Sequence, residues 1–153
     1  MNNAFYEAIK DNFLISTNPI LLDVKAIYQY LSQESYWAKN IPLATVEKSI
    51  KHSLCFGMYD GSELIGFARL ITDMATFAYL CDVFVMVTYR KRGLSKWLMQ
   101  TIHMHPELQG LRRWLLGTRD AQGLYQQFGW EVVPEDMYKR FMQLHFPDVY
   151  VKD

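Results

Sequence analysis

An apolar run from Phe77 to Val87, eleven residues interrupted by one charge at Asp82, constrains the fold of this chain more than any other feature. Successive side chains of a strand point to opposite faces of a sheet, so a strand without polar alternation is typical of a sheet covered on both faces. The run is shorter than the roughly 18 residues that a membrane-spanning helix needs. We therefore predict a central, buried strand at 77–87.

Periodic patterns elsewhere predict the elements around this strand. Two strand-like runs, 54–59 and 64–71, are joined by Asp60-Gly61-Ser62-Glu63, and Asp-Gly is a strong hairpin signal. Apolar stripes and turn residues predict four helices and three further short strands. The helices are expected at about 23–33, 45–53, 93–105 and 121–128, and the strands at 13–16, 114–118 and 137–144. The order predicts an α+β fold with a mixed central sheet of about six strands and about four helices.

The bulk composition limits the classes of function. A chain of 153 residues is expected to form one domain over 1–153, and half of its residues are hydrophobic. Sixteen basic and sixteen acidic side chains cancel, which argues against nucleic acid or an anionic membrane as a partner. Cys55 and Cys81 lack metal-site or disulfide spacing, so we expect reduced core thiols and no metal. The N-terminus lacks the features of a signal peptide, which predicts a cytoplasmic protein.

A basic turn connects the central strand to the next helix. Arg90, Lys91 and Arg92 precede Gly93, and the stretch 83–106 also contains Lys96 but no carboxylate. A helix N-terminus presents unpaired N–H groups and partial positive charge, and a glycine there allows close approach of a phosphate. A solvated surface turn is the alternative. The turn matches neither the P-loop nor the G-x-G-x-x-G pattern, so a nucleotide hydrolase or a Rossmann dehydrogenase is disfavoured.

Two motifs resemble those of one enzyme family. The turn Arg90-x-x-Gly93-x-Ser95, following Asp82-Val83-Phe84-Val85, resembles the acetyl-CoA-binding pattern Q/R-x-x-G-x-G/A of the GNAT superfamily of N-acetyltransferases. The segment 121–130, Ala-Gln-Gly-Leu-Tyr-Gln-Gln-Phe-Gly-Trp, resembles the family's A…LYxxxGF helix and turn. Ser95 departs from the usual Gly or Ala. The two motifs and the element order cover about residues 54–142 and imply a GNAT-like acyl-CoA N-acyltransferase fold.

The resemblance implies where acetyl-CoA would bind. The pyrophosphate would lie on the backbone amides from Arg92 to Ser95, and the pantetheine alongside a bulged strand. A backbone N–H near Val85 would polarise the thioester carbonyl. The predicted cofactor-binding residues are therefore Phe84, Val85, Met86, Arg90, Lys91, Arg92, Gly93, Leu94 and Ser95.

Two side chains are candidates for catalysis. Tyr125 matches the family tyrosine that protonates the departing CoA thiolate, although its spacing also suits a core aromatic residue. Asp82 is the candidate general base, because an isolated carboxylate in an apolar strand must face a cleft or pair with a cation. A structural pair of Asp82 with Arg69 or Arg119 is the alternative, and Glu63 or a water chain could serve as base instead. Tyr36 and Trp37 either line the acceptor pocket or anchor their loop.

The predicted function is transfer of the acetyl group of acetyl-CoA, as co-substrate, to a primary amine within a ternary complex. The acceptor is a small molecule or a peptide amine, and the sequence does not distinguish them. A non-catalytic acyl-CoA-binding regulatory module of the same fold is the alternative, because a fold alone does not define an activity. A homodimer formed through the strand expected at 137–144 is also considered.

Overall fold

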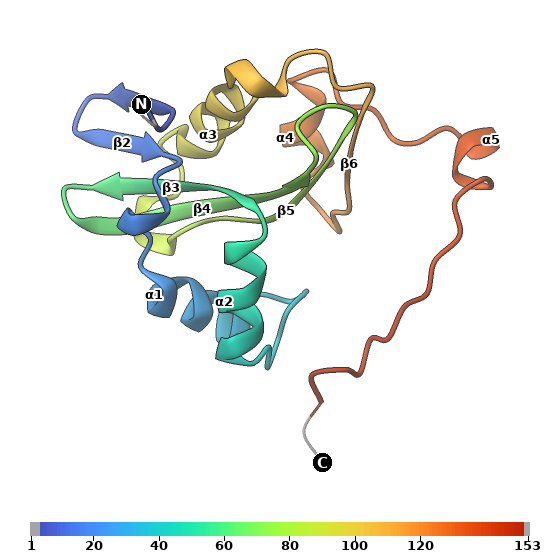
Figure 1. Cartoon of the computed structure of the whole chain (residues 1–153), viewed down its shortest axis with the longest axis horizontal. Helices are drawn as coiled ribbons and strands as arrows, with labels where there is room; N and C mark the ends of the chain where they lie inside the picture. The colour runs from blue at the N-terminus through green and yellow to red at the C-terminus, as the bar shows by residue number, and fades with distance from the viewer. Residues whose placement is uncertain (1–3, 152–153) are drawn as a thin grey trace.

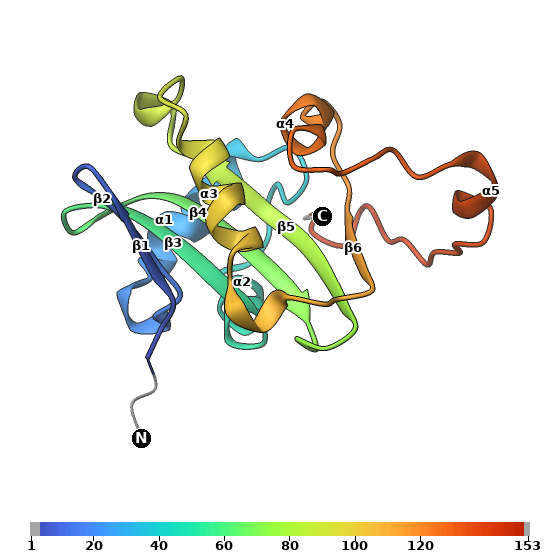
Figure 2. The same cartoon turned by 90° about the horizontal axis from the view of Figure 1, so that it is seen from above.

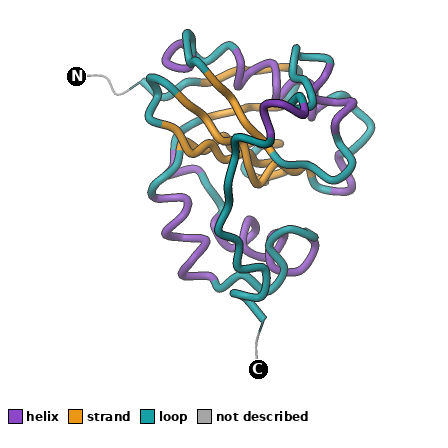
Figure 3. Tube along the Cα trace, turned by 90° about the vertical axis from the view of Figure 1, so that its right-hand side faces the viewer, coloured by secondary structure: helices purple, strands orange, loops and turns teal. Residues whose placement is uncertain are grey.

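The computed structural model describes residues 4–151 and consists of one mixed sheet with helices on both faces (Figures 1 and 3). The strands are β1 (Glu7–Lys10), β2 (Phe13–Ser16), β3 (Leu54–Asp60), β4 (Glu63–Thr72), β5 (Phe77–Val85) and β6 (Arg113–Leu116). The helices are α1 (Val24–Gln29), which continues into a π-helical turn at Tyr30–Glu34, α2 (Leu43–Lys51), α3 (Leu94–His103), α4 (Gln122–Gln126) and α5 (Glu135–Tyr138).

The strands lie in chain order, β1-β2-β3-β4-β5-β6. Neighbours from β1 to β5 are antiparallel, whereas β5 and β6 are parallel because α3 forms the crossover between them. The predicted Asp-Gly hairpin joins β3 to β4, with Asp60 opposite Glu63 and Gly61 at φ 58°. The mixed six-stranded α+β arrangement predicted from the sequence is confirmed.

Two cores cover the two faces of the sheet. On one face α3 buries Leu94, Trp97, Leu98 and Ile102 against the sheet. These four side chains form the apolar stripe that the helical spacing predicted. On the other face α1 and α2 pack against a second cluster that includes Phe67 and Phe84 (Figure 2). The central strand β5 therefore contributes to both cores, which explains its apolar sequence.

Three expectations from the sequence were wrong in detail. No strand forms at 137–144, where α5 is followed by irregular chain, because no strand among residues 4–151 pairs with this segment. The central strand ends at Val85 instead of Val87, and a 3-10 turn at Val87–Tyr89 follows it. The strand β1 was missed, because Glu7–Lys10 lies at the sheet edge and its side chains are mostly exposed.

Candidate active site

A bulge in β5 creates the space for a site. Phe84 pairs with Phe67 and Cys81 pairs with Arg69, so β5 has one residue more than β4 between these pairs. Asp82 lies in this interval with φ 53°, a left-handed conformation that is uncommon for a residue other than glycine. Such a backbone conformation within a strand needs support from specific contacts, and the carboxylate of Asp82 makes two hydrogen bonds.

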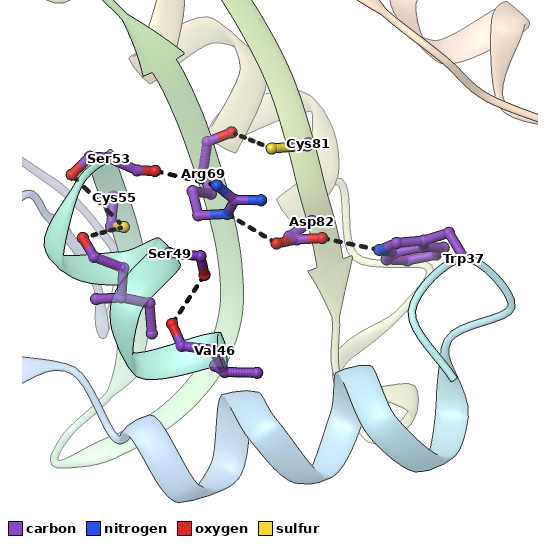
Figure 4. A network of polar contacts seen from close by, with 9 residues as sticks. Trp37, Val46, Ser49, Ser53, Cys55, Arg69, Cys81 and Asp82 are labelled. Atoms are coloured by element: carbon purple, nitrogen blue, oxygen red, sulfur yellow. Dashed lines mark hydrogen bonds and ion pairs between the residues drawn. The ribbon is translucent and has the colours of Figure 1, made fainter. Parts of the chain in front are cut away.

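Both carboxylate oxygens of Asp82 are hydrogen-bonded (Figure 4). Arg69 Nε lies 2.8 Å from Oδ2, and Trp37 Nε1 donates to Oδ1 at 2.9 Å. Arg69 also donates to Ser53 Oγ at 3.0 Å. Burial alone would lower the pKa of Arg69, but the adjacent Asp82 carboxylate outweighs it and the net shift is upward. The pair with Arg69 that was considered from the sequence is thus present, and Trp37 connects it to the loop after α1.

Beyond the bulge β5 and β6 separate. Their last pair is Leu80 with Leu116, and a pocket of about 450 Å³ lies where the strands diverge. Its walls come from β5, the start of α3, the chain after β6, α4 and the loop after α1. They include Tyr30, Tyr36, Trp37, Tyr79, Asp82, Val83, Phe84, Val85, Arg90, Ser95, Arg119, Asp120 and Tyr125. The pocket therefore brings Asp82 and Tyr125, the two predicted catalytic residues, to one cavity.

The edge of β5 that faces this pocket has backbone groups without a strand partner. Met86 N–H donates to the carbonyl of Ile65 in β4 at 2.8 Å. Because N–H groups alternate between the two edges of a strand, the N–H of Val85 points to the edge from which β6 has diverged. A ligand with amide groups can pair with such an edge as a further strand would.

Tyr125 is a buried phenol in the wall of the pocket, 8% exposed. Burial, with a smaller contribution from Tyr36, raises the pKa of Tyr125 to about 12. The hydroxyl group is therefore protonated at neutral pH and can donate a proton or a hydrogen bond. Tyr36 is itself fixed, because its hydroxyl accepts the N–H of Arg119 at 3.0 Å and its ring lies 3.9 Å from the Arg119 guanidinium.

The basic turn between β5 and α3 surrounds a hollow of about 330 Å³. Lys91 and Gly93 have φ of 63° and 74°, and these two left-handed residues turn the chain into α3. No side chain caps Gly93, and the first α-helical bond of α3 runs from Trp97 N–H to Gly93 O. The amides of the first turn are thus available to an anion. The lining of this hollow includes six residues of the predicted set, together with the adjacent Lys96: Val85, Arg90, Lys91, Gly93, Leu94 and Ser95.

Arg90 is held within the protein. Its Nε donates to Val85 O at 3.0 Å, and Nη2 donates to the hydroxyl of Tyr30 at 3.0 Å. The ring of Tyr30 stacks on Phe84, with centroids 3.9 Å apart. Sequence reasoning missed Tyr30, because local patterns give no signal of a contact between residues 60 positions apart. Arg92 lies instead over the ring of Tyr89, at 5.3 Å.

The remaining predicted residues occupy different surroundings. Phe84 and Val85 are buried and Met86 is half-buried beside the second core. Glu63, the alternative base, accepts from the hydroxyl of Tyr89 and is not among the residues lining the pocket. Among residues 4–151 no group of three or more His, Cys, Asp or Glu could hold a metal ion. No helix in this range is long and apolar enough to cross a membrane.

A bulged central strand, a diverging parallel strand and a basic turn at an uncapped helix N-terminus are together typical of an acyl-CoA transferase of the GNAT type. The sequence profile of the acetyltransferase (GNAT) family matches residues 24–130, and the chain belongs to this family. The family and the named relatives below identify it as an acyltransferase.

Relatives agree with this membership. FG08082 of Gibberella zeae, named as a candidate acetyltransferase, is 33% identical over 138 residues, 76% of this chain and 77% of that protein. A candidate GNAT acetyltransferase from Xanthomonas campestris pv. campestris is similar in structure, with 46% identity, a TM-score of 0.88, and coverage of 94% of this chain and 100% of that chain. A GNAT family acetyltransferase from Elizabethkingia anophelis, solved with acetyl-CoA bound, shares the fold at 15% identity, with a TM-score of 0.61 over 82% and 80% of the two chains.

Proposed function

We propose that this protein transfers the acetyl group of acetyl-CoA directly to a primary amine bound in the same pocket. The observation that carries the proposal is the open edge of β5 at Val85, which lies in one pocket with Tyr125 and leads to the basic turn at the start of α3. The three parts of the site match three parts of the cosubstrate: the diphosphate, the pantetheine amides and the thioester.

In this proposal acetyl-CoA lies extended along the protein, from the N-terminus of α3 back along the open edge of β5. The first-turn amides of α3, with Lys91 and Arg92, hold the pyrophosphate. The pantetheine pairs with the free edge of β5. The N–H of Val85 hydrogen-bonds to the thioester carbonyl and stabilises the negative charge that develops on this oxygen during attack. Arg90 supports this geometry by fixing the carbonyl of Val85.

The amine nitrogen attacks the carbonyl carbon, and the C–N bond forms before the C–S bond breaks. The leaving sulfur takes its proton, or a hydrogen bond, from Tyr125, whose raised pKa keeps it neutral. Asp82 is the proposed acceptor of the ammonium proton. Each of its oxygens already accepts one hydrogen bond, and a carboxylate oxygen can accept a second. The further proton that the nitrogen loses as the amide forms returns to Tyr125, so the products are an N-acetyl amine and free CoA.

The lining of the pocket favours a cationic amine as the acceptor, either a small molecule or a peptide amine. Aromatic rings of Tyr36, Trp37 and Tyr79 line it together with the carboxylates of Asp82 and Asp120. Aromatic faces and carboxylates both attract an ammonium group.

Free-thiol release from acetyl-CoA should be followed with a panel of amines that covers polyamines, amino acids, aminoglycosides and lysine-containing peptides. The expected result is thiol release that requires one class of amine, with the acetylated amine identified by mass spectrometry. Thiol release at the same rate without any amine would show a hydrolase and contradict the proposal.

A further inference from the structure

A row of contacts along the pocket joins β5 to the chain that follows β6. Asp82 of β5 accepts the indole N–H of Trp37 at 2.9 Å (Figure 4). The ring of Trp37 lies edge-on to the ring of Tyr36, with centroids 5.0 Å apart. Tyr36 in turn contacts Arg119, whose guanidinium carbon lies 3.9 Å from the ring centroid. All four residues line one pocket, so a carboxylate, two aromatic rings and a guanidinium follow one another along its wall.

Arg119 is positioned by contacts that leave its N–H donors available. Its backbone N–H donates to the hydroxyl of Tyr36 at 3.0 Å, and its guanidinium lies over the ring of the same residue. An aromatic ring attracts a guanidinium but takes up none of its N–H groups in a conventional hydrogen bond. The planar guanidinium can therefore still bind both oxygens of a carboxylate in a paired arrangement.

The ion pair of Arg119 with Asp120 is weak. The closest nitrogen and oxygen are 3.6 Å apart, and the two side chains are 65% and 68% exposed. An exposed ion pair with this geometry contributes little, because water and salt screen it. A carboxylate brought by a bound substrate can therefore replace Asp120 at the guanidinium.

The other charged groups of the pocket already have strong partners. Arg90 donates to a backbone carbonyl and to a tyrosine hydroxyl, each at 3.0 Å. Asp82 is paired with Arg69 at 2.8 Å. Of the two arginines that line the pocket, Arg119 is thus the one whose donors can serve a substrate.

We infer that Arg119 makes this enzyme selective for amino acids, that is, for amines that carry a carboxylate at some distance from the reacting nitrogen. The inference rests on the proposed acetyl transfer and names its acceptor class. The amine lies toward Asp82 and the open edge of β5, and the carboxylate binds the guanidinium of Arg119. A carboxylate suits this site better than a phosphate, because a single available cation beside Asp120 balances one negative charge but not two.

Matched acceptors test the inference through kcat/KM for thiol release from acetyl-CoA. Straight-chain amino acids from glycine to aminohexanoate are each compared with the corresponding carboxamide and with the alkylamine of the same length. At the best length the amino acid should exceed its amide about tenfold in kcat/KM, mainly through KM, because the guanidinium gains one charge-assisted interaction at a partly exposed site. The length at which the preference is largest measures the separation between the amine and carboxylate sites.

Variants assign the preference to one side chain. Arg119→Gln should reduce kcat/KM for the amino acid to that for its amide, and Arg119→Lys should retain part of the preference, because it keeps the charge without the planar fork. Asp120→Asn should lower KM for the amino acid, because it removes the competing carboxylate. Arg112→Gln is the matched control, since Arg112 is exposed just before β6 and does not line this pocket. It should keep the full preference.

Equal kcat/KM for amino acids and their amides in the wild type would overturn the inference and leave the proposed acetyl transfer intact. A preference that survives Arg119→Gln, or that is lost equally in Arg112→Gln, would overturn it as well. A higher kcat/KM for aminoethyl phosphate than for every amino acid would assign the guanidinium to a phosphate and contradict the inference. Thiol release that no amine stimulates would instead contradict the proposed function, and the inference would fail with it.

Discussion

Arg69 of β4 and Asp82 of β5 are paired where the two strands lose register, with Nε 2.8 Å from Oδ2. Their side chains are only 14% and 9% exposed. The pair lies at the bulge in β5, and the indole N–H of Trp37 connects it to the loop after α1. Asp82 is thus both a partner in a structural ion pair and the proposed general base, so its variants must be tested for both stability and activity.

Asp82→Asn should destabilise the fold strongly, because Arg69 then keeps its charge without a counter-ion in a nearly buried position. The expected loss in the free energy of unfolding is about 3 kcal/mol. Trp37→Phe is the control, since it retains a ring but removes one hydrogen bond to Asp82, and should cost about 1 kcal/mol. Urea denaturation measures both values. Equal losses in the two variants would show that the charge of Asp82 is not what stabilises the bulge.

Tyr125→Phe should lower kcat about 100-fold at unchanged affinity for acetyl-CoA, because it removes only the proton donor. The pKa of Tyr125 is raised to about 12, so its neutral form persists as pH rises well past the ordinary value near 10. Loss of activity through ionisation of this phenol should therefore begin only as pH approaches 12. Initial rates across pH test this: a Tyr125-dependent fall near pH 10 would show that the pKa of Tyr125 is not raised, whereas an unchanged kcat in Tyr125→Phe would exclude the proton-donor role.

Gly93→Ala should weaken acetyl-CoA binding, whereas Gly110→Ala should not. Both glycines have positive φ, 74° and 80°, and at both an added Cβ would meet no atom within 4 Å. Their substitutions carry similar backbone strain of about 1 kcal/mol, so the difference in affinity isolates the approach of the phosphate to Gly93. Calorimetry compares the two variants. Equal affinities would place the pyrophosphate elsewhere.

Arg90→Lys should lower the melting temperature, because an ammonium group cannot reproduce the two directed bonds to Val85 and Tyr30. A loss of about 1 kcal/mol corresponds to roughly 2–4 °C for a domain of this size. Lys91→Met is the control, since it removes a charge from the same turn and should leave the melting temperature unchanged. If Arg90→Lys melted at the same temperature as the wild type, the two hydrogen bonds of Arg90 would not stabilise the fold.

The sequence predicted the parts of the fold that depend on local patterns. The apolar run of β5, the Asp-Gly hairpin and the stripe of α3 each carry their own signal, and the two motifs located the pocket that contains Asp82 and Tyr125. Long-range contacts gave no such signal. The hydrogen bonds from Arg90 to Tyr30 and from Trp37 to Asp82 join residues that are far apart in the sequence, so they depend on the tertiary fold.

The strand expected at 137–144 shows a different limit. Its alternation is present in Met142 and Leu144, but a strand also needs a partner edge, and local sequence does not say which chain supplies it. The structure of a single chain leaves this segment irregular.

Calorimetric titration of the purified protein with acetyl-CoA measures whether the basic turn and the open edge of β5 bind this cosubstrate. Saturable binding of one acetyl-CoA per chain is expected, weakened in Gly93→Ala and unchanged in Tyr125→Phe. The absence of binding in a folded wild-type protein would contradict it.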